Sequence, residues 1–80
     1  MSKEYYRKRL IDLREALKRE KEAKKRDNEK YAGYIRNATS ASTKASWRKS
    51  KIDASASHDR RIESIKRDIE RNKEYLKREK

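Results

Sequence analysis

The sequence NATSASTKAS, residues 37–46, lies at the midpoint of an 80-residue chain and carries one charged residue, Lys44. By contrast, 50% of all residues are charged, and they crowd both sides of this stretch. Small hydroxyl side chains can satisfy the free N–H groups that open a helix, and they compete with helical backbone hydrogen bonds. We therefore predict that the chain reverses direction here, between two helices.

The composition favours long helices. Apolar residues make up 31% of the chain, which has one glycine, no proline and no cysteine. A chain this short buries a small core, and without cysteine neither a disulfide nor a cysteine-rich zinc site can add stability. The excess of Lys, Arg, Glu, Ala, Leu and Ile is typical of coiled coils. Interleaved charges and helically spaced apolar residues argue against a disordered chain.

Apolar residues in the first half recur with the three-four spacing of the a and d positions of a coiled-coil heptad. This stripe is apolar at both ends and polar in its middle, where Glu20, Lys24 and Asp27 take the interface positions. We expect the stripe to face a second helix.

The second half repeats this spacing from Ile62 to Leu76, whereas Trp47 and Ile52 lie out of that register. The pattern therefore predicts a shift of the helix interface near residue 55. The interface residues predicted from both halves are Leu10, Leu13, Leu17, Tyr31, Tyr34, Ala38, Ile52, Ile62, Ile65, Ile69 and Leu76.

An antiparallel fold about residue 43 brings the two stripes together. It places Leu10 opposite Leu76 and Tyr34 opposite Ile52. The halves also match in charge, with 13 basic and 7 acidic residues in each of the ranges 2–36 and 44–80.

We therefore predict an all-α fold, a single antiparallel two-helix hairpin or coiled coil over residues 1–80. Helix 1 is expected at about 2–38, the turn at about 39–43 and helix 2 at about 44–79. The predicted turn residues are Thr39, Ser40, Ser42 and Thr43, and the last three are candidate caps of the second helix. One continuous helix that pairs with another chain remains the alternative.

No residue pattern points to catalysis, and we expect a non-enzymatic chain without a cofactor or a metal. His58 and Asp59 are adjacent, so on a helix their side chains point about 100° apart, and we interpret His58 as a solvated or turn-facing residue. No carboxylate pair lies in an apolar setting that would shift its pKa for acid–base work. Phosphate-binding loops, nucleophile elbows and zinc-ligand spacings are absent from the sequence.

The formal net charge of +12 makes nucleic acid a candidate partner, because binding would release counterions. The candidate contacts are Trp47, Arg48, Lys49 and Lys51, where an aromatic ring that could stack on a base stands among basic residues. Acidic residues are interspersed along the chain, however, whereas dedicated binders concentrate their positive charge on one side. Nucleic acid is therefore the secondary hypothesis.

No stretch has the length and apolar character of a signal peptide or a membrane span, so we expect a cytoplasmic protein without membrane contact. The helical pattern reaches the last residue without a capping glycine. Either this end frays or the natural chain continues as helix, and we favour the second.

A Ser-x-Ser-Thr-x-x-Ser segment, residues 40–46, precedes a basic helix with repeated Ile-x-x-Ile spacing, residues 61–69. This arrangement resembles the helical N-terminal regions that precede TIR domains in many bacterial proteins, several of them linked to anti-phage defence. The resemblance covers most of the chain and implies an oligomerising or positioning module. TIR enzymes cleave NAD, but this sequence holds no TIR domain, so that activity does not follow. The segment between Trp47 and His58 is longer than in the usual pattern.

The length, a tryptophan near the bend and the pattern from Tyr75 to Glu79, Tyr-x-x-x-Glu, also resemble the small Trp-x-Gly helical hairpins of type VII secretion. The residues Trp47-Arg48-Lys49 depart from that motif, because lysine stands where glycine is expected, and such proteins are seldom so basic.

A single hairpin leaves several large side chains poorly covered, namely Tyr5, Ile11, Ile35 and Tyr75. We therefore expect a homo-oligomer in which two hairpins form a four-helix bundle. The leading hypothesis is an assembly or adaptor module of a bacterial or phage defence-type protein, with a second protein partner or a fused downstream domain. The alternatives are a secretion-associated hairpin and a basic nucleic-acid-binding protein.

Overall fold

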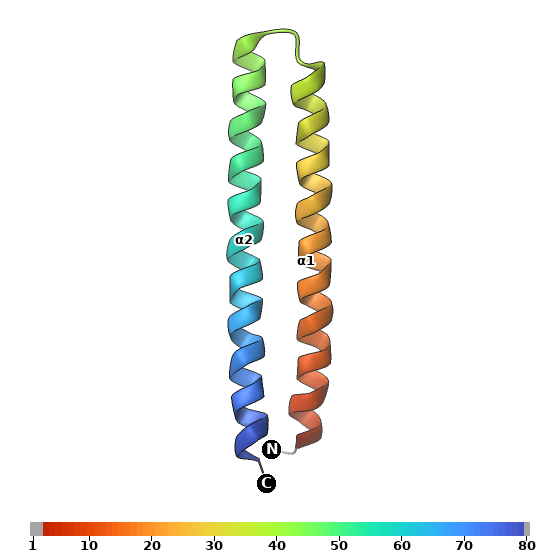
Figure 1. Ribbon diagram of the computed structural model, residues 1–80, viewed down its shortest axis with the longest axis vertical. Helices are drawn as coiled ribbons and strands as arrows, with labels where there is room; N and C mark the ends of the chain where they lie inside the picture. Colours follow the sequence, from red (N-terminus) through yellow and green to blue (C-terminus); the bar gives the residue numbers. More distant parts are fainter. Residues whose placement is uncertain (1–2, 80) are drawn as a thin grey trace.

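The chain forms two long α-helices that run antiparallel to each other. The computed structural model describes residues 3–79. α1 spans Lys3–Asn37 and α2 spans Ala41–Arg78, and together they make a rod of 62 × 14 × 12 Å. The start of α1 lies beside the end of α2, and the turn lies at the opposite end of the rod (Figure 1). The predicted all-α hairpin is confirmed, and the alternative of one continuous helix is wrong.

The turn is shorter and earlier than the sequence predicted. Only residues 38–40 separate the two helices, so Ser42 and Thr43 belong to the first turn of α2 rather than to the loop. Ala38, which was expected in the helix interface, lies just past the end of α1, where its N–H donates to the Ile35 carbonyl at 3.4 Å. The expected helix start at residue 2 lies outside the described residues.

Ser40 sets the start of α2. Its backbone is extended (φ −121°, ψ 154°), and its Oγ accepts a hydrogen bond from the Thr43 N–H at 3.2 Å. The same hydroxyl donates to Thr43 Oγ1 at 2.8 Å. One hydroxyl thus satisfies a free N–H of the first helical turn, and the residues after Ser40 can adopt helical geometry at once.

The apolar core is thin and lies toward the end of the hairpin that is remote from the turn. Among the described residues no large side chain is completely shielded from solvent. Leu10, Leu13 and Ile69 form a buried cluster, and Leu17, Ile65 and Leu76 pack against it. Ile62 is also buried, and all seven residues come from the predicted interface.

Near the turn, the predicted pairing of Tyr34 with Ile52 does not form. The ring of Tyr34 lies 4.6 Å from that of Trp47, whereas Ile52 is 68% exposed. The early turn explains the difference, because it centres the pairing of the helices near Ala41 instead of residue 43. Tyr34 therefore meets a residue earlier in α2 than expected.

The interface on α2 also continues without the predicted shift near residue 55. Stepping back from Ile62 by four and three residues leads to His58, which is buried, and to Ser55, which is partly buried. Polar residues thus carry the three-four spacing through the middle of the hairpin. Within residues 3–79, neither helix combines the length and apolar character needed to cross a membrane.

Replacing the capping serine tests this account of the turn. We expect Ser40→Ala to lower the free energy of unfolding by about 1 kcal/mol, because it leaves a helix N–H without its partner. Urea denaturation measures the change. Ser46→Ala is the matched control, since Ser46 is exposed within α2 and alanine is the better helix former. An equal loss in both variants would contradict the capping role of Ser40.

Candidate functional site

The middle of the hairpin holds a polar section of the helix interface. Glu20, Lys24 and Asp27 occupy the interface positions of α1, as the sequence pattern predicted, and all three are partly buried. α2 places His58 against Glu20 and Asp27. Charged residues at such positions are costly unless they find partners across the interface.

His58 finds two such partners. The residue is 7% exposed, its Nδ1 lies 2.5 Å from Glu20 Oε1 and its Nε2 lies 2.6 Å from Asp27 Oδ2. Glu20 and Asp27 are one heptad apart on α1, so one carboxylate lies at each end of the imidazole. Both ring nitrogens can donate only when the ring is an imidazolium. We call this arrangement of three residues the histidine clamp.

Further ion pairs surround the histidine clamp. Arg61 Nη1 lies 3.2 Å from Glu20 Oε1, and Lys24 Nζ lies 2.6 Å from Asp59 Oδ1. One turn nearer the bend, Ser55 donates to Asn28 Oδ1 at 2.8 Å. Within residues 3–79 no buried side-chain nitrogen or oxygen lacks a hydrogen-bond partner. The polar section is therefore fully satisfied, which is the condition under which buried polar groups specify one arrangement.

The geometry shifts the pKa of all three clamp residues. The hydrogen bonds to Asp27 and then to Glu20 raise the pKa of His58 above its ordinary value, against the opposing effect of burial. The hydrogen bond from His58 in turn lowers the pKa of Glu20 and that of Asp27. Both shifts stabilise the charged carboxylates and come first from the hydrogen bonds with His58, so they are not the shifts of an apolar setting that would suit acid–base work.

The histidine clamp holds an imidazolium between two carboxylates. Both imidazole nitrogens are engaged, so His58 has no site left for a substrate proton. The two carboxylates lie at opposite ends of the ring and do not converge on one point. Within the described part of the chain, no group of three or more His, Asp or Glu side chains could hold a metal ion.

The interpretation of His58 as a solvated residue was wrong. The sequence argument compared His58 with Asp59 on the same helix, whereas the partners of His58 lie on the other helix. The signal was nevertheless present, because His58 precedes Ile62 by four residues and continues the interface spacing of α2. Extending that stripe backwards would have placed His58 opposite the polar middle of α1.

The bend carries an aromatic cluster on one side. The Trp47 ring lies 6.0 Å from Tyr31 and 4.6 Å from Tyr34, and Lys30 Nζ lies 5.1 Å from the centre of the Tyr31 ring. Trp47 is partly buried by these contacts. The ring surface that Trp47 would need for stacking on a base is therefore partly covered by the two tyrosines.

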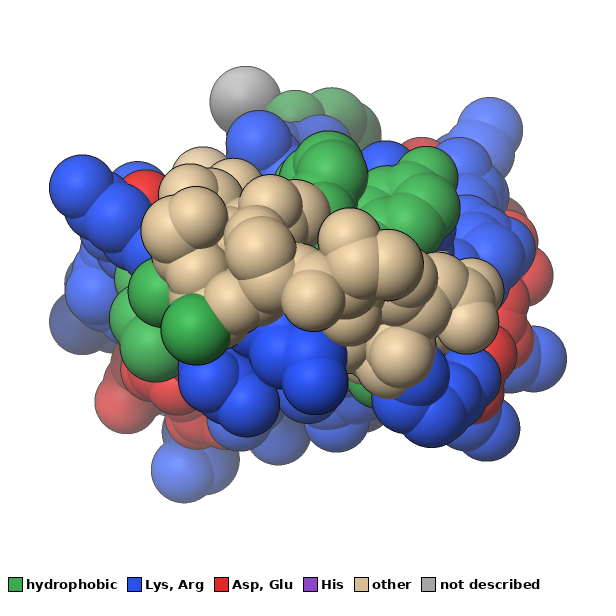
Figure 2. Space-filling view, turned by 90° about the horizontal axis from the view of Figure 1, so that it is seen from above, with side chains coloured by type: hydrophobic (Ala, Val, Ile, Leu, Met, Phe, Trp, Pro, Cys, Tyr) green, Lys and Arg blue, Asp and Glu red, His purple; other side chains and the backbone are tan. Residues whose placement is uncertain are grey.

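Two of the other three predicted contacts line a groove whose lining does not include Trp47. Arg48 and Lys51 line a groove with Ile35 and Ile52, whereas Lys49 is exposed on α2. Figure 2 looks onto the bend and shows hydrophobic side chains on two sides of the polar turn, with Lys and Arg around both.

The segment around the bend has no acidic residues. The sequence motifs considered above did not indicate this uneven distribution of charge. Residues 30–52 contain six basic side chains and no Asp or Glu. Half of the net charge of +12 therefore lies in this segment around the turn. Comparing the charge of the bend with that of the arms, rather than one arm with the other, would have revealed it.

Comparison with known proteins yields no relative. No family model, curated protein or solved structure matches the chain. A function must therefore be argued from the histidine clamp, the aromatic residues and the basic bend.

The shifted pKa values predict how stability depends on pH. The raised pKa of His58 stabilises the fold below the ordinary value of 6.5, and this contribution is lost as the pH rises through the folded value. The lowered pKa values of Glu20 and Asp27 stabilise the fold above the ordinary carboxyl values of 4.5 and 3.8, and are lost as the pH falls. Melting temperature followed by circular dichroism should therefore peak between about pH 4.5 and 6.5.

Two variants separate the clamp from the many other charges. His58 is the only histidine, so His58→Gln should flatten the decline on the alkaline side. Glu22→Gln removes an exposed carboxylate of α1 outside the clamp and should leave the profile of the original chain unchanged. An alkaline decline that survives in His58→Gln would show that another group causes it.

Proposed function

We propose that the chain is a non-enzymatic assembly module, a helical hairpin that pairs with a second copy to form a four-helix bundle. The exposure of three tyrosines on one flank carries this proposal. Tyr5, Tyr34 and Tyr75 are 50%, 42% and 38% exposed. Large aromatic side chains left in solvent on a chain with so small a core are typical of contact surfaces.

Aromatic residues gather at both ends of this flank. At the end remote from the turn, the Tyr6 ring lies 5.3 Å from Tyr5 and 5.5 Å from Tyr75. At the bend, Tyr34 packs on Trp47. Tyr34 follows Tyr6 by four heptads, and Tyr75 follows Trp47 by four heptads, so the two clusters occupy the same side of the coiled coil. We call this side the aromatic flank.

One column of α2 connects the two clusters at heptad spacing. It consists of Trp47, Ala54, Arg61, Asp68 and Tyr75. Its charged members are already in ion pairs, Arg61 with Glu20 at 3.2 Å and Asp68 with Arg71 at 3.6 Å. The column thus has aromatic ends, a small residue and partly neutralised charges between them.

A two-fold axis near Arg61 would bring the columns of two copies together in antiparallel order. It would set the Trp47 end of one copy against the Tyr75 end of the other, so that the exposed tyrosines of both copies are covered together. Contacts that obey this symmetry are the commonest kind between identical chains. The bundle would also add cover to a core that buries four apolar side chains.

The proposal agrees with the resemblance to helical regions that precede TIR domains, which implies an oligomerising module in defence-type bacterial proteins. The aromatic flank supports it independently of that resemblance. The nucleic-acid hypothesis is weaker, because Trp47 contributes its rings to the aromatic cluster instead of presenting them to a base.

Self-association should make stability depend on protein concentration. The melting temperature should rise as the concentration is raised, since a dimer is favoured by mass action, and sedimentation should show the shift from monomer to dimer. Tyr75→Asn should weaken the dimer about tenfold or more, because the smaller polar side chain buries less apolar area between the two copies.

Ile11→Asn provides the matched control. Ile11 is 59% exposed and follows the buried Leu10, so it lies away from the aromatic flank. Its replacement should leave the monomer–dimer equilibrium unchanged. Melting that is independent of concentration, together with monomeric sedimentation, would refute assembly, and loss of the dimer in Ile11→Asn alone would refute the aromatic flank.

A further inference from the structure

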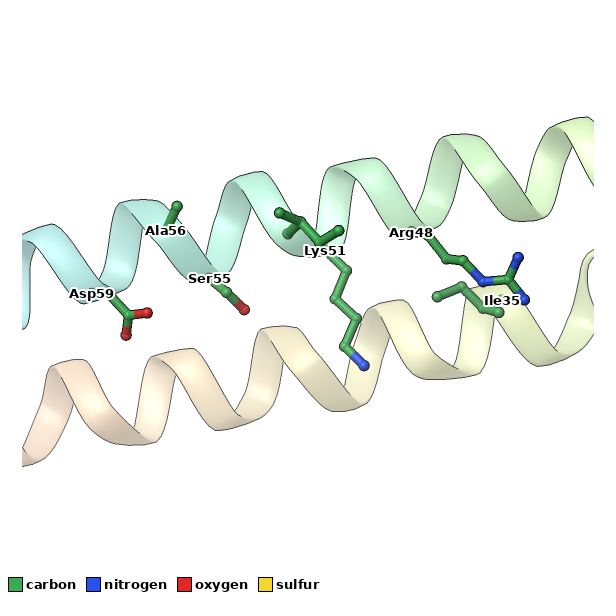
Figure 3. A pocket seen from close by; sticks show the side chains of 7 residues that line it. Ile35, Arg48, Lys51, Ser55, Ala56 and Asp59 are labelled. Carbon is green, nitrogen blue, oxygen red and sulfur yellow. The ribbon is translucent and has the colours of Figure 1, made fainter.

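We propose that a groove beside the bend, on the side away from the aromatic flank, binds an acidic amphipathic helix of a partner protein. The groove has a volume of about 580 Å³. α1 contributes Ile35 and α2 contributes the other residues that line it: Arg48, Lys51, Ile52, Ser55, Ala56 and Asp59 (Figure 3). We call it the isoleucine groove.

Apolar side chains offer the groove a hydrophobic contact. Ile52 is 68% exposed and is the most exposed large apolar residue of the described chain. Ala56 follows it by one helical turn, and Ile35 faces the same groove from α1. Side chains at such spacing can receive the apolar stripe of a helix that lies along the hairpin.

The basic side chains at the groove favour an occupant with negative charge. Arg48 and Lys51 line the groove, and Figure 3 shows Lys51 reaching across toward α1 while Arg48 lies beside Ile35. Within residues 3–79 neither of them forms an ion pair, since the pairs found involve other residues. Asp59, the acidic residue of the groove, is held by Lys24 at 2.6 Å. The free charge at the groove is therefore positive.

The surroundings add to this charge. Residues 30–52 hold six basic side chains and no acidic one. An occupant with glutamates or aspartates beside its apolar stripe would complement both the isoleucines and the unpaired bases. Such complementarity favours correct partners and speeds association.

Two other occupants fit the groove less well. A second copy of this chain, docked here by its own acid-free bend, would set like charges against each other. Nucleic acid would satisfy Arg48 and Lys51 but leave Ile52 without an apolar partner. The groove therefore differs in its partner from the aromatic flank, and the two proposals stand independently.

Binding of a synthetic peptide tests the inference. The probe is a helix of about 20 residues with leucines at a and d positions and glutamates beside them, labelled for fluorescence anisotropy. At about 150 mM salt we expect saturable binding to the whole chain, because the groove supplies apolar contact as well as charge. A peptide with lysines in place of the glutamates, and one with serines in place of the leucines, should both fail to bind.

Matched pairs of variants locate the site. Ile52→Asn should weaken binding about tenfold or more, whereas Ile11→Asn, at another exposed isoleucine, should not. Arg48→Gln combined with Lys51→Gln should weaken binding more than Lys77→Gln combined with Arg78→Gln. Both double variants remove two positive charges, so they differ only in position. Circular dichroism of each variant confirms that it keeps its helices.

Three results would overturn the inference: no saturable binding of the acidic leucine peptide, equal binding of the serine peptide, or unchanged affinity in Ile52→Asn. A DNA duplex serves as competitor, and tight binding of DNA that depends on Arg48 and Lys51 but not on Ile52 would assign the groove to nucleic acid instead. Sedimentation of the same samples reports self-association separately, so a failure of either proposal can be recognised by itself.

Discussion

The ion-paired contact of His58 with Glu20 and Asp27 is the constraint on which the rest of the hairpin depends. Leucines and isoleucines at heptad spacing can pair in several registers, because each step of one heptad places apolar residues opposite apolar residues again. The histidine clamp permits one register, since a slip would leave buried charges without partners. Asn72, the other buried polar residue of the described chain, bonds to the Asp68 carbonyl of its own helix at 2.9 Å and therefore says nothing about register.

The register fixed in the middle determines what the bend presents. With His58 between Glu20 and Asp27, Tyr34 lies against Trp47, and Ile35 lines the same groove as Ile52. The aromatic flank and the isoleucine groove are thus consequences of the same pairing, on different sides of the hairpin. A protonation equilibrium at His58 therefore acts on the contact that holds both surfaces in place.

The sequence was sufficient to predict the two helices and the apolar end of their interface. Leucine and isoleucine at three-four spacing form an apolar stripe, which is buried by packing against a second helix. The sequence was insufficient for the exposure of Ile52 and for the partners of His58, which depend on which residues face each other across the interface. The register of the helices follows from the length of the turn. Three hydroxyl residues were candidate caps of α2, and the first of them, Ser40, is the one that caps it. Because the turn lies a few residues earlier than predicted, the helices face each other in a different register. Ile52 is therefore on the surface, and the partners of His58 were not predicted.

The middle of the hairpin and the bend are held by different interactions. This difference explains why the positive charge at the bend is not neutralised by neighbouring carboxylates. In the middle, cations such as Arg61 and Lys24 are bound by carboxylates of the facing helix. At the bend, Tyr31, Tyr34 and Trp47 join the helices by ring contacts, which need no carboxylate. The basic residues of this segment therefore have no acidic neighbour within it to bind them. Because ring contacts stabilise the bend, Arg48 and Lys51 stay available for the acidic partner that we propose at the isoleucine groove.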